Sequence, residues 1–247
     1  MWNALAPDLT PGLVGGSLSR LVESQEQIAT ARLVSGDLNK QATLEAMLEP
    51  TKPERRPGTE HLDYLLSTPW RYPPLRYGSR YGRRFEPSLF YGALGTRTSL
   101  AESAYYRWVF LTDIQTPPAS IQSQHTLYLA QYRSEKGLRL QHAPFAQYRD
   151  QLTHPSLYES CQELGSQMRE TGIEVFEYPS ARDKEGGNNV ALFTPAALHS
   201  THAEKQRAWL CTTEQQEVVF SYQGRPAEVH RFALKDYLHK GEFPKPA

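Results

Sequence analysis

Short apolar segments with strand-like periodicity recur through the second half of the chain, and they constrain the fold more than any other feature. Hydrophobic and polar residues alternate at 126–133, and strand-like segments follow at 173–180 and 189–195. Residues 217–234 predict two further strands around a Gln-Gly turn. Apolar residues at helical spacing over 155–172 predict a helix between the first two segments. This order predicts an α+β fold with a mixed sheet.

A second helix is predicted directly after a short strand at 88–94. Thr98 or Ser99 is expected to open it, because hydroxyl side chains favour helix N-termini. Apolar residues then recur at spacings of four, four and three, which places them on one face. These residues are Leu100, Ala104, Trp108 and Leu111. The helix is therefore expected to pack one side against the sheet.

The N-terminal part, 1–60, is predicted to be a helical extension and linker preceding a domain at 61–247. Residues 17–34 carry apolar side chains at roughly helical offsets, and Asp37 is placed to cap a second helix. Residues 51–60 combine several charges with two prolines and a glycine, which is typical of a solvated linker.

Charge and composition exclude several classes of protein. Among 247 residues, 27 Lys and Arg balance 27 Asp and Glu, so nothing favours nucleic acid or an anionic membrane as the main partner. No apolar run approaches the roughly 18 residues of a membrane helix. The start of the sequence has no signal-peptide pattern, and Cys161 and Cys211 are expected to be reduced, half-buried thiols. The expected location is the cytoplasm.

Motifs of the common nucleotide-binding and hydrolytic enzymes do not occur in the sequence. It contains no G-x-G-x-x-G, Walker A, H-E-x-x-H or G-x-S-x-G pattern. His199 and His202 are three positions apart but have no third ligand nearby in the sequence, so a surface pair is favoured over a zinc site. No metal is expected.

An arginine- and tyrosine-rich segment at 67–93 carries the most unusual chemistry, together with one carboxylate and one serine farther along. Arginines grip phosphate oxygens in a bidentate manner, and tyrosines offer flat faces to a ring. A lone carboxylate can stabilise the positive charge that develops at an anomeric carbon. Nicotinamide leaves NAD as a neutral molecule from a cationic ring, so no general acid is required. The composition therefore suits N-glycosidic cleavage of a pyrophosphate dinucleotide. The candidate site residues are Arg71, Tyr72, Arg80, Tyr91, Glu102 and Ser180.

Each candidate also has a purely structural interpretation. Ser99 and Glu102 have the spacing of a helix capping box. Arginines in a Pro- and Gly-rich loop are usually solvated or paired with acids such as Glu86. Tyr91 fits a strand in the core, and Ser180 fits a turn. Taken one at a time, these residues leave both interpretations open.

Two ordered blocks of the sequence carry a family resemblance. The first, 70–107, contains an early arginine, a Gly-x-Arg-aromatic step, a Tyr-Gly-Ala strand and an Ala-Glu helix start; these are Arg71, 78–81, 90–93 and 101–102. The second, 173–195, contains Tyr-x-Ser-x-Arg at 178–182 and a strand that ends in proline. Together the blocks resemble the RES-domain family, named for an arginine, a glutamate and a serine. The segments before them resemble its longer subtype, which has an N-terminal extension.

This resemblance implies an ADP-ribosyltransferase-like mixed sheet core with flanking helices. RES domains are toxins of bacterial toxin–antitoxin pairs, usually neighboured by an Xre-type antitoxin. They consume NAD by hydrolysis or phosphorolysis, or they transfer ADP-ribose to a protein. NAD is thus expected as substrate rather than cofactor, the antitoxin as partner, and DNA only through the antitoxin. Assembly with further copies of the chain is compatible with this picture. A catalytically inactive partner-binding domain is the alternative of a different class.

The resemblance also implies roles for individual residues. Arg71 and Arg80 would hold the pyrophosphate and the adenosine-side ribose, while Tyr72 and Tyr91 would frame the nicotinamide end. Glu102 would be catalytic, with Arg80 and Tyr91 beside it, and Ser180 would support the site. The two arginines are only nine positions apart and two more follow at 83–84, so their assignment to individual phosphates stays open. Inhibition is expected from the antitoxin or from a lid formed by residues 1–60.

Overall fold

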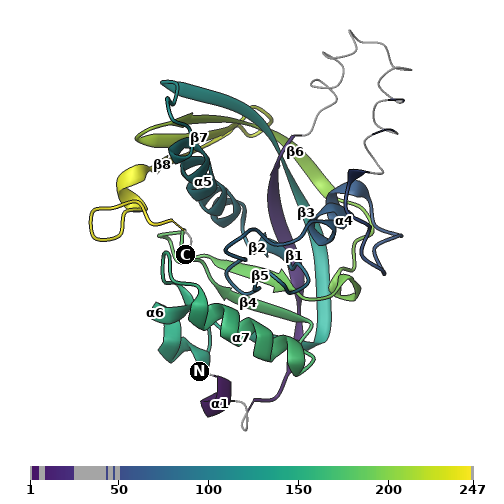
Figure 1. Ribbon diagram of the computed structural model, residues 1–247. Helices are drawn as coiled ribbons and strands as arrows, with labels where there is room; N and C mark the ends of the chain where they lie inside the picture. Colours follow the sequence, from purple (N-terminus) through teal and green to yellow (C-terminus); the bar gives the residue numbers. More distant parts are fainter. Residues whose placement is uncertain (1, 6–8, 25–42, 44–46, 48–50, 246–247) are drawn as a thin grey trace.

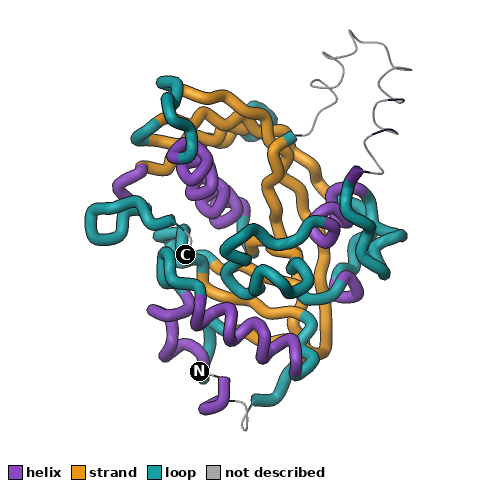
Figure 2. Tube along the Cα trace, in the orientation of Figure 1, coloured by secondary structure: helices purple, strands orange, loops and turns teal. Residues whose placement is uncertain are grey.

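The computed structural model describes residues 2–5, 9–24, 43, 47 and 51–245, which form a mixed sheet with helices on both sides (Figures 1 and 2). The helices are α1 (Trp2–Leu5), α4 (Tyr64–Arg71), α5 (Thr96–Thr112), α6 (Arg149–Leu152) and α7 (Glu159–Glu170). The strands are β1 (Gly12–Glu23), β2 (Phe90–Ala93), β3 (Ser120–Arg139), β4 (Val175–Pro179), β5 (Asn188–Leu192), β6 (Glu204–Glu214), β7 (Glu217–Tyr222) and β8 (Glu228–Ala233). The predicted α+β class is confirmed. No helix in these ranges is long and apolar enough to cross a bilayer.

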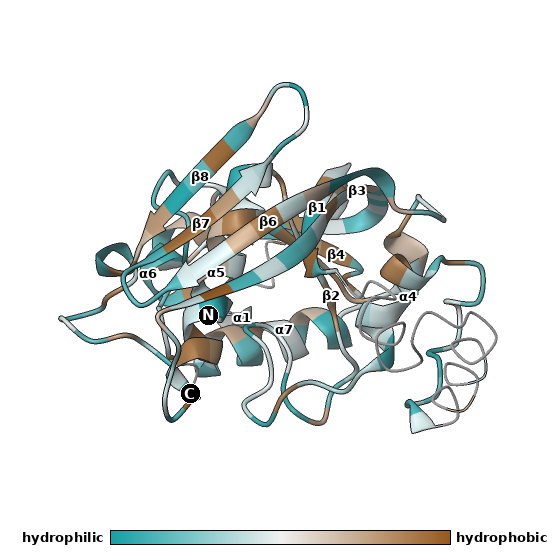
Figure 3. Cartoon of the chain, turned by 90° about the horizontal axis from the view of Figure 1, so that it is seen from above, coloured by the Kyte–Doolittle hydropathy of each residue, from teal (hydrophilic) through white to brown (hydrophobic). Residues whose placement is uncertain are grey.

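The sheet has eight strands in the order β1-β2-β5-β4-β3-β6-β7-β8, and β1 also pairs with β3. Strands β1, β2, β5, β4 and β3 therefore close into a ring, while β6, β7 and β8 extend from the other edge of β3. Among the strands that the structure describes, only the β3–β4 pair is parallel. The long strand β3 joins the two parts of the sheet. Figure 3 shows both hydrophilic (teal) and hydrophobic (brown) residues along β8.

The predicted helix at 17–34 is wrong where the structure describes it, because residues 12–23 form strand β1. This strand pairs with β3 from Gly12 opposite Gly137 to Glu23 opposite His125. Val14 and Leu18 of β1 are buried in one cluster with residues of β2, β3 and β5, and this burial outweighs a weak helical spacing. Strand β1, which precedes residue 60, therefore belongs to the same sheet as the strands that follow residue 60. The helix expected after Asp37 lies outside the described residues.

Helix α5 packs its predicted apolar face against β6, β7 and β8. Leu100, Ala104, Trp108 and Leu111 are all buried in one cluster with Trp209 and Phe220. The helix begins at Thr96 with Gly95 as its N-cap, three residues before Ser99. The N–H of Ser99 already donates to the carbonyl of Gly95, so Ser99 lies inside the helix. The capping box is therefore wrong, and Glu102 is not part of a helix cap.

Helix α7 covers the other side of β4 and β5 and confirms the helix predicted at 155–172, although Leu157 precedes it and is 60% exposed. A Cβ on Gly165 would lie 2.0 Å from the carbonyl oxygen of Tyr81, so glycine alone permits this close approach. The ring of Tyr81 packs edge-on against Phe176 at 4.8 Å. These two contacts hold Tyr81 against α7 and β4.

Two residues of the predicted linker at 51–60, Arg56 and Thr59, contact the rest of the domain, while most of the others are exposed. Arg56 donates to the carbonyls of Ser88 and Phe193, each at 3.0 Å, and its guanidinium lies over the Trp70 ring. Thr59 is buried. Helix α4 follows directly, with Asp63 as its N-cap. Both cysteines are free, and both are fully buried rather than half-buried.

Candidate active site

A cavity of about 290 Å³ lies between β1, β2 and the first turns of α5. Three predicted residues from separate elements line it: Arg80, Tyr91 and Glu102. Its other walls include Tyr158, Tyr178, Arg182 and Asn189. This volume is at the lower end of the range of about 300–1,000 Å³ for small-molecule sites. The cavity is thus of a size for a small molecule or for part of a larger one.

Glu102 projects from α5 with one carboxylate oxygen held by two donors. The hydroxyl of Ser180 donates to Oε1 at 2.6 Å, and Nδ2 of Asn189 donates to the same oxygen at 2.7 Å. In the described part of the chain Oε2 makes no hydrogen bond. The carboxylate is therefore oriented through one oxygen, and the other is available to a ligand.

Ser180 is both a turn residue and part of the site. Its hydroxyl oxygen accepts the backbone N–H groups of Arg182 at 3.1 Å and Asp183 at 3.0 Å. Because a hydroxyl has two lone pairs and one proton, these bonds direct the proton to Glu102. The two interpretations of Ser180 from the sequence are compatible.

The loop between β4 and β5 is fastened to the first turn of α5. The hydroxyl of Thr98 donates to Oδ2 of the buried Asp183 at 2.7 Å. Gly187 lies so close that a Cβ would be 2.0 Å from the Thr98 hydroxyl oxygen. This contact brings Ser180 and Asn189, from the two ends of the loop, to Glu102.

Tyr91 extends from β2 into the site with its hydroxyl already bonded. The hydroxyl pairs with Ser79 Oγ at 2.9 Å and accepts the N–H of Tyr81 at 3.1 Å. Burial raises the pKa of Tyr91 to about 12, so the side chain is neutral near pH 7. Its carbonyl accepts a hydrogen bond from Arg20.

Arg80 is held by backbone and ring contacts rather than by an acidic side chain. Its Nη1 donates to the carbonyls of Leu152 at 3.2 Å and His154 at 2.9 Å, and the guanidinium lies 4.5 Å from the Tyr158 ring centroid. Nε and Nη2 have no carbonyl or carboxylate acceptor within the described ranges. The arginine is thus fixed in place with donors available to an anion.

Two predicted residues, Arg71 and Tyr72, do not line this cavity. Arg71 is the last residue of α4, and its Nε donates to the carbonyl of Pro53. Tyr72 is 43% exposed and lines a second cavity between α4 and β1. Arg20 lines both cavities and was missed, because residues 17–34 were interpreted as a helix.

Asn189 was also missed, since it lies at the start of a predicted strand and nothing in the sequence distinguishes it from a structural residue. Its position opposite Tyr178 in the β4–β5 pair places it beside Ser180. Among the described residues no group of three or more His, Cys, Asp or Glu could hold a metal ion.

A family model for the RES domain matches residues 53–214, about two thirds of the chain. The chain belongs to the RES-domain family. The matched range of this RES domain includes Arg80, Tyr91, Glu102, Ser180 and Asn189, whereas β1 and Arg20 precede it. RES domains are a toxin-associated family whose members generally act on NAD. A comparison with curated proteins gave no match.

Proposed function

We propose that this RES protein is an NAD-cleaving enzyme that breaks the nicotinamide–ribose N-glycosidic bond. The observation that carries the proposal is the carboxylate of Glu102, oriented through Oε1 by Ser180 and Asn189 inside a cavity with arginines and tyrosines. Such a carboxylate is prepared before the substrate arrives, and preorganised charge is the larger part of transition-state stabilisation in many enzymes.

The reaction follows from this arrangement. The bond from ribose C1′ to the nicotinamide nitrogen breaks, and its electron pair neutralises the cationic ring. C1′ becomes oxocarbenium-like, and Glu102 offsets its positive charge. A water or phosphate oxygen then bonds to C1′, and a water acceptor gives up a proton to solvent. No acidic group has to protonate nicotinamide.

Arginine side chains would bind the phosphates. Arg20 and Arg80 both line the cavity, and a guanidinium donates two parallel hydrogen bonds to phosphate oxygens. The rings of Tyr91 and Tyr178, with centroids 6.5 Å apart, offer walls for the nicotinamide.

Incubation of the purified protein with NAD, with and without phosphate, tests the proposal. We expect free nicotinamide in both cases, and mass spectrometry or NMR identifies the other product. ADP-ribose would identify water as acceptor, its 1″-phosphate ester would identify phosphate, and ADP-ribose bound to a protein would identify a transferase. Unchanged NAD in every mixture would contradict the proposal and favour the alternative, a catalytically inactive partner-binding domain.

We further propose that the protein is the toxin of a toxin–antitoxin pair and acts in the cytoplasm. Its toxin-associated family supports this assignment. An enzyme that destroys NAD there needs an inhibitor, and an Xre-type antitoxin is proposed to cover the cavity. A carboxylate of that partner could occupy the arginine donors in place of phosphate.

Arg80→Lys is expected to raise the KM for NAD about tenfold and to lower the melting temperature. Lysine keeps the charge but lacks the planar fork that reaches two backbone carbonyls while presenting donors to phosphate. Steady-state kinetics and thermal denaturation measure the two effects. Arg83→Lys is the control, since Arg83 is on the surface and pairs with Glu163. An unchanged KM for NAD in the Arg80 variant would show that other arginines bind the phosphates.

Ser180→Ala and Asn189→Ala are each expected to lower kcat for NAD consumption by about 10- to 100-fold. Each removes one hydrogen bond to the Glu102 carboxylate, and a bond to a charged group contributes about 1.5–3 kcal/mol. Nicotinamide release under saturating NAD measures the effect. Wild-type kcat in both folded variants would show that the orientation of Glu102 does not matter.

A further inference from the structure

The second cavity, of about 310 Å³, lies between α4 and the end of β1 and adjoins the Glu102 cavity. Tyr64, Thr68 and Tyr72 line it at successive spacings of four residues along α4 and its C-cap. Ser24 and Thr126 contribute hydroxyl groups on the opposite wall. The cavity thus combines aromatic surface with small polar groups, as a site for a nucleobase requires.

Arg20 belongs to both cavities and connects them. Strand β1 pairs with β2 only through Ser19 and Ala93, so in the described structure no strand covers this edge of β1 beyond that pair. The side chain of Arg20 crosses the edge and donates through Nη1 to the carbonyl of Tyr91. An elongated ligand could pass over β1 at this point from one cavity to the other.

The guanidinium of Arg20 has donors that its surroundings do not use. Its Nε is buried without a hydrogen-bond partner, and in the described residues its Nη2 makes no hydrogen bond. The group lies over the ring of Phe90, 5.2 Å from the centroid. A buried donor without an acceptor is costly, so an anion at the junction of the cavities would be favourable beside this arginine.

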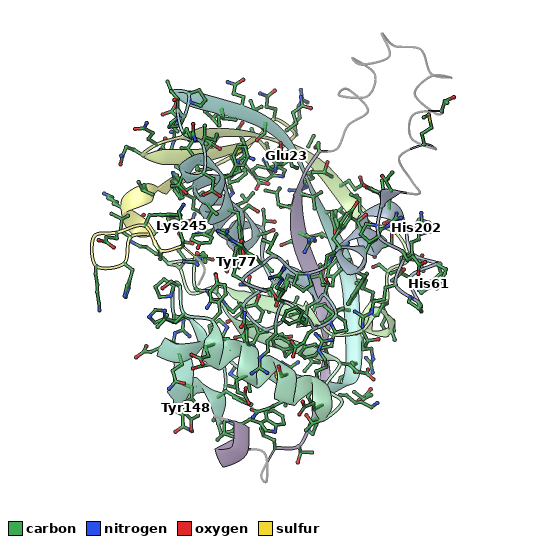
Figure 4. The ribbon with its side chains drawn as sticks, in the orientation of Figure 1. Glu23, His61, Tyr77, Tyr148, His202 and Lys245 are labelled. Atoms are coloured by element: carbon green, nitrogen blue, oxygen red, sulfur yellow. The ribbon has the colours of Figure 1, made fainter. Side chains whose placement is uncertain are left out.

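The acidic residue at the rim does not oppose an anion there. Glu23, labelled in Figure 4, ends β1, and its carboxylate pairs with Nη1 of Arg107 at 2.9 Å. The negative charge of Glu23 is thereby balanced, while the positive charge of Arg20 is paired with no carboxylate in the described part of the molecule.

We propose that the second cavity binds the adenosine half of NAD, with adenine against Tyr72 and the pyrophosphate at Arg20. The nicotinamide riboside half then lies at Glu102, and this inference rests on the proposed function. The two cavities have similar volumes, about 290 and 310 Å³, and the two halves of NAD are of similar size. Tyr72 would therefore contact adenine, whereas the family resemblance implied a position at the nicotinamide end. It determines specificity for the dinucleotide rather than taking part in bond cleavage.

Nicotinamide mononucleotide separates this role from catalysis, because it has the same scissile bond but no adenosine. For Tyr72→Ala we expect a rise of about tenfold in the KM for NAD with unchanged kcat. The kcat/KM for nicotinamide mononucleotide should stay at the wild-type value. Tyr72→Phe should restore the KM for NAD, since it keeps the ring. Phe85→Ala is the matched control, because Phe85 is 92% exposed and lines neither cavity.

Binding of AMP, followed by saturation-transfer NMR, tests the cavity without turnover. Weaker binding of AMP to Tyr72→Ala than to the wild type and Phe85→Ala would support the inference even if no NAD were cleaved, in which case the proposed function would fail alone. Equal binding of AMP to all three proteins would overturn the inference. So would an unchanged KM for NAD in Tyr72→Ala when the wild type cleaves NAD.

Discussion

Glu102→Gln is expected to reduce NAD consumption by about 10²–10⁴-fold while the protein remains folded. The amide has nearly the same shape, and its oxygen can still accept the bonds from Ser180 and Asn189. It carries no negative charge, so it cannot offset the positive charge that develops at C1′. The loss should therefore appear in kcat much more than in KM. Nicotinamide release, together with a thermal melt of each protein, measures both properties.

A matched control distinguishes a specific effect from the general loss of a carboxylate. Glu174 also accepts a hydrogen bond from a serine, Ser134 at 2.7 Å, but it lies outside the cavity beside Lys136. Glu174→Gln should leave the rate unchanged. If folded Glu102→Gln consumed NAD at the wild-type rate, Glu102 would be a structural residue and the proposed mechanism would fail.

The sequence predicts the position of a site residue where that position depends on neighbouring residues in the chain. Tyr91 lies in a short strand and Glu102 in the helix that follows, so the local sequence determines both positions. Ser180 comes from a distant strand, so no local pattern in the sequence determines its distance from Glu102. The structure brings these three residues together.

The errors concern contacts that depend on distant parts of the chain. Arg20 lies in β1, whose partner strand begins about 100 residues later, and no local pattern reveals that pairing. Helix α4 contains Pro69, which weakens any helical signal, so the sequence does not reveal that Arg71 and Tyr72 lie at the end of a helix. Their place was decided by packing of Leu66 and Trp70 against β1 and β2.

Deletion of residues 1–58 is expected to prevent folding, rather than to release an internal lid. The deletion removes β1, which pairs with β3 over almost its whole length and closes the ring through β2. It also removes Val14 and Leu18 from the core and exposes one edge of β3. Circular dichroism and a thermal melt should show no cooperative transition for the shortened chain.

Leu18→Ala provides a graded test of the same argument in the full-length chain. Leu18 is fully buried against Gly92, and truncation of a buried leucine costs about 2–5 kcal/mol. We expect a lower melting temperature, while Arg20 and the cavity remain in place.

A chain without residues 1–58 that folds and consumes NAD faster than the full-length protein would contradict the deletion prediction and establish an internal lid. Because residues 12–23 supply Arg20 and part of the cavity wall, they cannot serve as a removable cover.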